Sequence, residues 1–319
     1  MPAHTVAIIG AGNMGHGFAA HFGIHGQDVT LLDHRESNLE SAATRIHDAV
    51  EFLDGEGLAD ADPATVVDGI DFTTDVASGV GDADIVLETV PEDLDIKHEV
   101  FAEVAAAVSD EAVLASNTSS IPITDIAAGV PDAAGQVAGC HWWYPPYLMT
   151  PVEVIRGEQT TDATIDRLRT FVETVDRDPI MVKRDVPGFV WNRVQRAIYR
   201  ECLYMVEEDI ASMEDINKAV RDGYARRTAA IGPFETIDIA GLEQKLTVTE
   251  WIQPTLCNDE EPSRLFHEHI EAGRGGIDDG AGFFEYDRPP EEITGERDRK
   301  VAAIRRALEE LERHESATD

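Results

Sequence analysis

A histidine and a glutamate twelve residues apart are the pair best suited to acid–base chemistry in this sequence. His141 ends an apolar stretch, and Glu153 lies inside the apolar run PVEVI, where an unpartnered carboxylate would be costly. Two adjacent strands joined by the intervening Pro-Pro turn would place Glu153 beside His141. Glu153 would then orient the imidazole and stabilise its protonated form, as a general base for an alcohol requires. The alternatives are a surface histidine at a strand end and a glutamate on a solvent-facing edge.

A second group of residues is typical of dinucleotide binding. Gly10, Gly12 and Gly15 follow the apolar run VAII at GxGxxG spacing, and Asp33 ends the next apolar run, VTLLD. The first glycine permits a tight turn, the second lets backbone approach a pyrophosphate, and the third lets a helix pack closely on the strand. Asp33 would accept hydrogen bonds from the adenosine ribose and repel a 2′-phosphate, which favours NAD over NADP.

These residues must be positioned by alternating strands and helices in the first half of the chain. Strands are expected at 5–9, 28–32, 84–88, 112–116, 136–142, 151–156 and 178–183. Helices are expected at 14–24, 36–54, 95–109, 122–128 and 162–175. Such alternation predicts a parallel sheet covered by helices on both faces, and the short loops between the later strands allow an antiparallel edge.

The pattern changes after residue 187. From Gly188 onward apolar residues recur at helical spacing and no strand is expected. The Gly-rich stretch 272–287 is interpreted as a loop, and a last helix is expected at 292–314. We therefore predict an α/β fold, with a Rossmann-type doubly wound sheet followed by a smaller all-α domain. The predicted domains are 1–185 for NAD and 186–319 for the substrate.

The charge of the chain restricts its partners. The 319 residues include 62 Asp and Glu against 26 Lys and Arg, a net charge of −36, and the acids are spread along the whole chain. This pattern is typical of a protein from a high-salt cytoplasm, where salt screens the repulsion between carboxylates. The alternative is an acidic enzyme from an ordinary cytoplasm. In either case the negative electrostatic field of the chain repels nucleic acid and anionic membranes, so neither is expected as a partner.

The cysteines and histidines indicate neither a disulfide framework nor a metal site. The three cysteines have no CxxC or zinc spacing, so free thiols in a reducing compartment are expected. The N-terminus enters a strand almost at once, which leaves no room for a signal peptide, and no apolar run approaches membrane length. A cytoplasmic protein is therefore expected. His267 and His269 form an HxH, interpreted as a solvated helix face, and no metal is expected.

The whole sequence resembles the 3-hydroxyacyl-CoA dehydrogenase superfamily. The matching segments, in chain order, are IGAGNMGHG, ETVPEDLDIKHEVF, SNTSSIPITDIA, AGCHWWYPPYLMTPVEVI, DVPGFVWNRV and GAGFFEYD. The resemblance implies an NAD-dependent oxidoreductase that interconverts a 3-hydroxyacyl-CoA and its 3-keto form, in fatty acid metabolism. It further implies a homodimer formed through the helical domain, with a small-molecule substrate as its other partner.

The resemblance also implies roles for individual residues. His141 would remove the proton from the 3-hydroxyl, Glu153 would orient it, and Ser119 and Asn192 would hydrogen-bond the reacting oxygen. Glu92 and Lys97 match positions that hold the ribose and nicotinamide side of the cofactor. The full set of implied cofactor residues is Gly10, Gly12, Asn13, Met14, Gly15, Asp33, Glu92, Lys97 and Asn117.

Two departures from the family pattern bear on the substrate. Tyr144 stands where the family has an asparagine that contacts the cofactor. The stretch 36–80, where enzymes that use CoA thioesters carry basic residues for the CoA phosphates, is acidic, and Arg45 is its one basic residue.

Several segments look most like a branch that includes L-gulonate 3-dehydrogenase and lambda-crystallin. They are VPEDLDIK, IGPFETIDIAG and the extension after GFFEYD. A free polar 3-hydroxy acid is therefore the alternative substrate, and Arg227, with Arg226 the weaker candidate, would meet its carboxylate. A non-catalytic structural protein of the crystallin type and an NAD-binding redox sensor are remote alternatives, because the catalytic set is complete.

Overall fold

The computed structural model describes residues 3–316 and divides the chain into two compact units. Unit 1 contains the residues up to Asn192 together with Asp298–Arg306. Unit 2 contains Arg193–Arg297 and the residues from Ala307 onward. Among residues 3–316, no helix combines the length and the apolarity needed to cross a bilayer.

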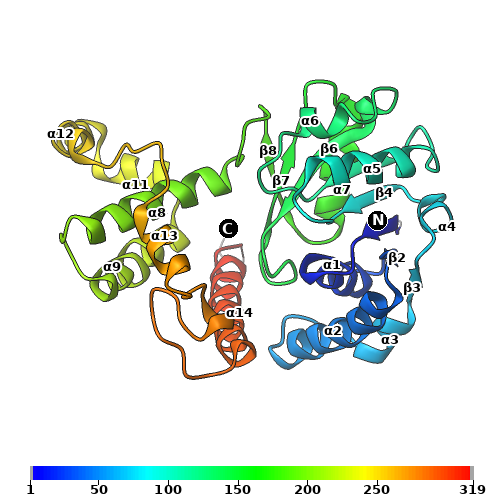
Figure 1. Cartoon of the computed structure of the whole chain (residues 1–319), viewed down its shortest axis with the longest axis horizontal. Coiled ribbons are helices and arrows are strands. Elements are labelled where there is room, and N and C mark those ends of the chain that lie inside the picture. Colours follow the sequence, from blue (N-terminus) through cyan, green and yellow to red (C-terminus); the bar gives the residue numbers. More distant parts are fainter. Residues whose placement is uncertain (1–2, 317–319) are drawn as a thin grey trace. The chain divides into compact units, whose positions relative to one another are not determined.

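Unit 1 is built on a single sheet of eight strands in the order β3-β2-β1-β4-β5-β6-β7-β8 (Figure 1). Neighbouring strands are parallel except β6 and β7, which are antiparallel, so the predicted parallel sheet and its antiparallel edge are confirmed. The strands are β1 (Thr5–Ile9), β2 (Asp28–Leu32), β3 (Ile70–Thr73), β4 (Ile85–Glu88), β5 (Val113–Ser116), β6 (Val137–Trp142), β7 (Pro151–Ile155) and β8 (Asp178–Val182).

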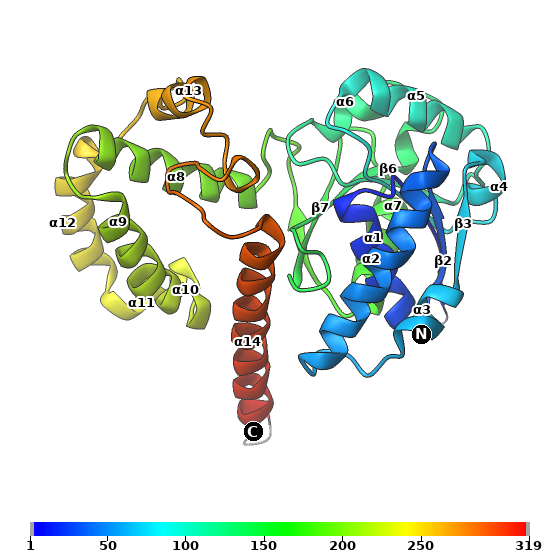
Figure 2. The same ribbon diagram turned by 60° about the horizontal axis from the view of Figure 1, so that its bottom comes forward.

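Helices cover both faces of this sheet, and α1 and α2 pack side by side on one of them (Figure 2). Along β1, Val6 and Ile8 belong to one buried cluster and Ala7 and Ile9 to the other, as expected for a strand buried on both faces. The helices of this part are α1 (Asn13–Ile24), α2 (Glu36–Gly55), α3 (Pro63–Asp68), α4 (Val76–Val80), α5 (Leu94–Ala105), α6 (Ile123–Ala127) and α7 (Asp162–Thr174).

Two parts of the prediction for this unit were incomplete. The edge strand β3 and the short helices α3 and α4 were not expected. β3 has only four residues, and most of it is partly exposed, so it lacks the apolar run that marked the other strands. Helix α5 ends at Ala105, four residues before the predicted end at 109.

Unit 2 is helical, as predicted. In its described part the only β pairing is a pair of isolated bridges at Ala281, inside the predicted Gly-rich loop. Its helices are α8 (Trp191–Glu207), which begins in unit 1, then α9 (Met213–Ala219), α10 (Ala225–Ala230), α11 (Pro233–Ala240), α12 (Leu242–Ile252) and α13 (Arg264–Glu271).

The last helix, α14 (Pro290–Ser316), contributes its segment Asp298–Arg306 to unit 1. Ala302 is fully buried against Leu53 and Leu148. Arg306 forms an ion pair with Glu56, just beyond the end of α2, at 2.7 Å between Nη1 and Oε2. This segment therefore covers the C-terminal end of α2.

Candidate active site

The sheet register places the candidate base and its partner directly opposite each other. His141 on β6 pairs with Glu153 on β7, and the His141 Nδ1 to Glu153 Oε2 distance is 2.7 Å. His141 is 4% exposed and Glu153 is fully buried. The antiparallel pairing that the Pro-Pro turn suggested is what brings the two side chains together.

The second carboxylate oxygen of Glu153 is held by backbone. Oε1 accepts hydrogen bonds from the N–H groups of Val190 and Trp191, at 2.7 and 3.0 Å. Burial by itself raises the pKa of Glu153, but the hydrogen bonds from His141 and from these N–H groups outweigh it, and the pKa lies below the usual range. Glu153 is therefore an anion that also fixes the start of α8.

The start of α8 brings Asn192 to the loop after β5. The Asn192 side-chain amide donates to the carbonyl oxygen of Ser119 at 3.0 Å, and Ser119 itself is exposed. Phe189, which lies just before α8, is 1% exposed, and its ring centroid is 5.8 Å from that of His141. Unit 1 thus collects all four predicted catalytic residues.

The glycine loop between β1 and α1 has the shape that a dinucleotide requires. Gly10 has a φ of +104°, and a Cβ on Gly15 would lie 1.8 Å from the Gly10 carbonyl oxygen, so neither position accepts a side chain. The space beside Gly12 is open for 4 Å. No side chain caps the N-terminus of α1, which begins with Asn13 and Met14, so its N–H groups suit a pyrophosphate.

Asp33, just beyond the end of β2, fits a ribose. Its Oδ2 accepts the N–H of Ala11 at 2.9 Å, and its Oδ1 accepts the N–H of Arg35 and the amide of Asn38 at 3.0 and 2.9 Å. His34 Nδ1 also lies 3.3 Å from Oδ1, whereas Oδ2 has a single donor and can accept a ribose hydroxyl as well. Asn38, whose amide helps to orient this carboxylate, was not predicted from the sequence.

Comparison with known protein families shows the family to which this chain belongs. The model described as "3-hydroxyacyl-CoA dehydrogenase, NAD binding domain" matches residues 5–186, and that described as "3-hydroxyacyl-CoA dehydrogenase, C-terminal domain" matches residues 188–286. The chain belongs to the 3-hydroxyacyl-CoA dehydrogenase family. It is therefore an NAD-dependent dehydrogenase with a Rossmann-type domain and a helical C-terminal domain.

Relatives of this dehydrogenase carry different substrate names. L-carnitine dehydrogenase of Nocardiopsis dassonvillei is 35% identical over 98% of this chain and 94% of that protein. A probable 3-hydroxybutyryl-CoA dehydrogenase of Deinococcus radiodurans is 35% identical over 88% of this chain and 99% of that protein. The crystal structure of an NAD⁺-dependent 5-formyl-3-hydroxy-2-methylpyridine 4-carboxylic acid 5-dehydrogenase has a TM-score of 0.89 and 34% identity, covering 97% of this chain and 99% of that one.

The other expected cofactor residues of the dehydrogenase contact protein groups. Lys97 is 1% exposed, and its Nζ lies 2.8 Å from Glu88 Oε1 and 3.5 Å from Glu92 Oε2. Asn117 Oδ1 accepts the N–H of Trp142 at 2.9 Å, beside His141. Glu88 was not predicted from the sequence, although an acid that ends the apolar run IVLE was the available signal.

The aromatic residues after His141 have different environments. Trp142 is buried in the core of unit 1 against Phe18 and Phe22, so it is a packing residue. Trp143 stacks on Trp191 with 4.1 Å between ring centroids. Tyr144, at the family's asparagine position, is 47% exposed.

The two arginines expected near a substrate carboxylate lie on α10 in unit 2. Arg226 forms an ion pair with Asp222 at 3.4 Å, and both side chains are at the surface. Arg227 is exposed and has no ion-pair partner among residues 3–316.

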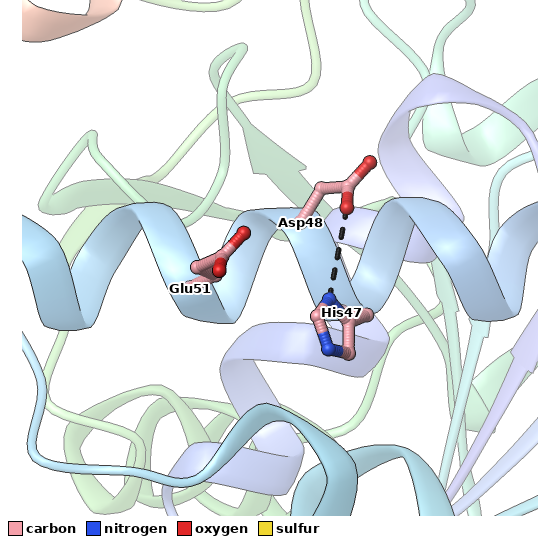
Figure 3. Close-up of side chains that lie close together, drawn as sticks. All are labelled: His47, Asp48 and Glu51. Carbon is pink, nitrogen blue, oxygen red and sulfur yellow. Dashed lines mark ion pairs between the residues drawn. The ribbon is translucent and has the colours of Figure 1, made fainter.

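One group of side chains on α2 has the composition of a metal site. His47, Asp48 and Glu51 lie close together on the exposed face of the helix, with 3.7 Å between His47 Nδ1 and Asp48 Oδ1 (Figure 3). Exposed acidic groups of this kind are common without an ion, so no role is assigned to them. In the HxH, His269 Nδ1 lies 2.8 Å from the carbonyl oxygen of Leu265 on its own helix.

Proposed function

We propose that His141 is the general base with which this dehydrogenase oxidises a 3-hydroxyl group. The observation that carries the proposal is the 2.7 Å contact between His141 Nδ1 and the buried Glu153, because it leaves Nε2 for the substrate. Nε2 takes the hydroxyl proton, Glu153 stabilises the resulting imidazolium, and Ser119 and Asn192 hydrogen-bond the reacting oxygen. NAD, when bound, supplies the acceptor for the hydride that leaves C3.

The residues proposed to hold NAD are those of the glycine loop and those that follow the carboxyl ends of the strands β2 and β5. Gly12 and the first residues of α1, Asn13 and Met14, face the pyrophosphate, and Asp33 receives the ribose. Gly10 and Gly15 shape the loop, and Asn117 orients the strand of His141. The proposed domain division, at 185/186, assigns cofactor binding to the first part of the chain and substrate binding and dimerisation to the second.

A 3-hydroxyacyl-CoA is the first candidate substrate, because both family models that match the chain carry that name. Oxidation of its 3-hydroxyl gives a 3-keto thioester, as in fatty acid metabolism. The thioester carbonyl, two carbons from the reacting C3, gives the site a group to anchor.

A free 3-hydroxy acid, of the L-gulonate 3-dehydrogenase kind, is the second candidate, and two observations favour it. Arg45, the one basic residue of 36–80, donates to the Ala11 carbonyl oxygen at 2.6 Å, so it serves the glycine loop. The α14 segment covers the end of α2. Both features leave this region poorly suited to CoA phosphates, which carry several negative charges.

A direct comparison of the two substrate classes tests the proposed function. NADH oxidation is followed in molar KCl with acetoacetyl-CoA and with free acetoacetate. We expect turnover with at least one of them, and the class that reacts identifies the anchoring group. Turnover with the thioester alone would remove the second candidate. The absence of turnover with either compound, while NADH binds, would contradict the proposed function.

If the substrate is a free acid, Arg227→Ala raises its KM by more than about tenfold, because a carboxylate loses a charge-assisted hydrogen bond. kcat changes much less, since the carboxylate is bound equally in the ground state and the transition state. Steady-state kinetics with free acetoacetate measure both constants. Arg226→Ala is the matched control, because Arg226 pairs with Asp222. An unchanged KM in the Arg227 variant would remove Arg227 from the site.

We further propose that the protein works in the cytoplasm of a halophile. Support comes from the net charge of −36 and from the three cysteines, all of which are free. Molar salt shortens the Debye length to about 3 Å and so reduces repulsion among the surface carboxylates.

We also propose that two copies associate through the helical C-terminal part. Its helices α11 and α12 contact each other and expose large apolar side chains, and α8 has no fully buried residue. The most exposed are Phe234 (81%), Trp251 (80%), Ile239 (76%), Leu242 (64%) and Leu246 (60%). An apolar surface of this kind, in so acidic a chain, is typical of a protein interface.

A further inference from the structure

A lysine lies buried between two carboxylates at the carboxyl ends of β4 and β5. The Lys97 Nζ is 2.8 and 3.0 Å from the two oxygens of Glu88 and 3.5 Å from Glu92 Oε2. Lys97 and Glu88 are each 1% exposed. A buried ammonium group is tolerated only when it is paired and hydrogen-bonded, so these carboxylates determine where Lys97 lies.

Glu88 is itself fixed from both sides. Both oxygens accept hydrogen bonds from the Lys97 ammonium group. Oε1 also accepts the N–H of Val90 at 2.7 Å, and Oε2 also accepts the hydroxyl of Ser116 at 2.6 Å. With two donors on each oxygen, the carboxylate has one orientation. Glu88 therefore anchors Lys97 to the ends of two central strands.

On the other side of Lys97, Glu92 organises the loop after β5. Glu92 Oε1 accepts the hydroxyl of Thr118 at 2.7 Å, the N–H groups of Ser119 and Ser120 at 3.0 and 2.9 Å, and the hydroxyl of Ser120 at 2.9 Å. These donors leave Oε2 facing Lys97. The loop is thus folded around a single carboxylate oxygen.

The same loop carries residues of the proposed catalytic site. Its first residue, Asn117, bonds the N–H of Trp142 beside His141, and the carbonyl oxygen of Ser119 accepts the amide of Asn192. A displacement of Glu92 would therefore move Ser119 relative to both His141 and Asn192.

We infer that Glu88, Lys97 and Glu92 form a charge clamp that positions the Ser119 loop, with Glu88 and Lys97 buried and Glu92 at its exposed end. In this clamp Glu88 and Lys97 are positioning residues that act on the loop through Glu92. The inference rests on the proposed function in one respect, the hydrogen bond from Ser119 to the reacting oxygen. The geometry of the clamp does not depend on it.

The variants Glu88→Gln, Lys97→Met and the double variant test the clamp. Each single change lowers kcat/KM by about 10- to 100-fold, because a displacement of about 1 Å in a reacting group has such an effect. In Glu88→Gln the NADH Kd changes less than about threefold, because Glu88 is not among the expected cofactor residues. The double variant loses less than the product of the two single losses, because Lys97→Met alone leaves Glu88 buried without its cation. Glu99→Gln, on the exposed side of α5, is the matched control.

Hydrogen–deuterium exchange gives a readout that needs no turnover. The amides of Ser119 and Ser120 bond to Glu92, so they exchange at least about tenfold faster in both single variants than in the wild type. If Glu88→Gln fails to fold, Thr118→Val removes one neutral donor from Glu92 and gives the same changes in milder form. Exchange is then read at the Ser119 amide alone, because Thr118 Oγ1 also accepts the N–H groups of Ser120 and Ile121.

The outcomes separate this inference from the proposed function. Lack of turnover by the wild type, together with faster exchange in the variants, would contradict the function and leave the clamp standing. Unchanged exchange and unchanged kcat/KM in Glu88→Gln would overturn the clamp. So would a loss of kcat/KM in Lys97→Met without faster exchange at the Ser119 and Ser120 amides, because Lys97 would then act without moving the loop.

Discussion

Exchanging Glu153 for glutamine lowers kcat by about 10³- to 10⁴-fold, although the new side chain has nearly the same shape. The reason lies in the two backbone donors on Oε1. The N–H groups of Val190 and Trp191 require an oxygen at that position, so the glutamine amide group must face His141 Nδ1. The NH₂ group of the glutamine then donates to Nδ1, so the imidazole proton must lie on Nε2. Nε2 can no longer accept the hydroxyl proton of the substrate.

This result is measured by steady-state kinetics on the better of the two substrates, with NADH Kd from fluorescence. NADH binding stays within about threefold of the wild type, since neither residue of the pair lies in the glycine loop. His141→Gln gives a loss of similar size, and the double variant is no worse than either single one, because the two residues act as a unit. Glu158→Gln, at an exposed position after β7, is the control. A loss below about tenfold in Glu153→Gln would show that Glu153 does not set the tautomer.

The pairing of His141 with Glu153 was predictable because strand pairing depends on local signals. The Pro-Pro turn and the two apolar runs around it determine an antiparallel pairing, and the register then places His141 opposite Glu153. The glycine loop was predictable for the same reason, since a positive φ at Gly10 and close packing at Gly15 each exclude side chains. These features lie within short stretches of sequence.

Features that depend on distant parts of the chain were not predictable from the sequence. Glu88 reaches Lys97 and Ser116 on two other elements, so its role appears only when β4, α5 and β5 are assembled. The packing of the α14 segment Asp298–Arg306 onto the end of α2 joins residues about 250 positions apart. An amphipathic pattern identifies such a helix but not the surface on which it packs.

We expect the wild type to be a dimer, formed through the helical C-terminal part, and the Trp251→Glu variant to be a monomer. Trp251 is 80% exposed near the C-terminal end of α12, and it is among the large apolar side chains that α11 and α12 expose. Large aromatic residues at the centre of an interface contribute most of its binding free energy, and a buried unpaired carboxylate opposes association. The folded unit tolerates the change, because an exposed side chain contributes little to the core.

Sedimentation velocity in molar KCl measures this outcome. The wild type sediments at twice the chain mass of 34.9 kDa and the variant at the chain mass. Met181→Glu, at an exposed apolar position on the edge strand β8, is the matched control and stays dimeric. A wild type that sediments at the chain mass, or a Trp251 variant that stays at twice that mass, would contradict the proposed interface.

Salt concentration gives an independent check on the same interface. Two copies that each carry a net charge of −36 repel each other. The apolar surface can therefore hold the dimer together only at salt concentrations that screen this repulsion. The wild-type dimer therefore dissociates as KCl is lowered toward about 0.1 M, where the Debye length is about 10 Å. A dimer held by ion pairs would behave in the opposite way, because salt weakens exposed ion pairs. Dissociation on dilution of the salt thus distinguishes an apolar interface in an acidic protein from one built on charge.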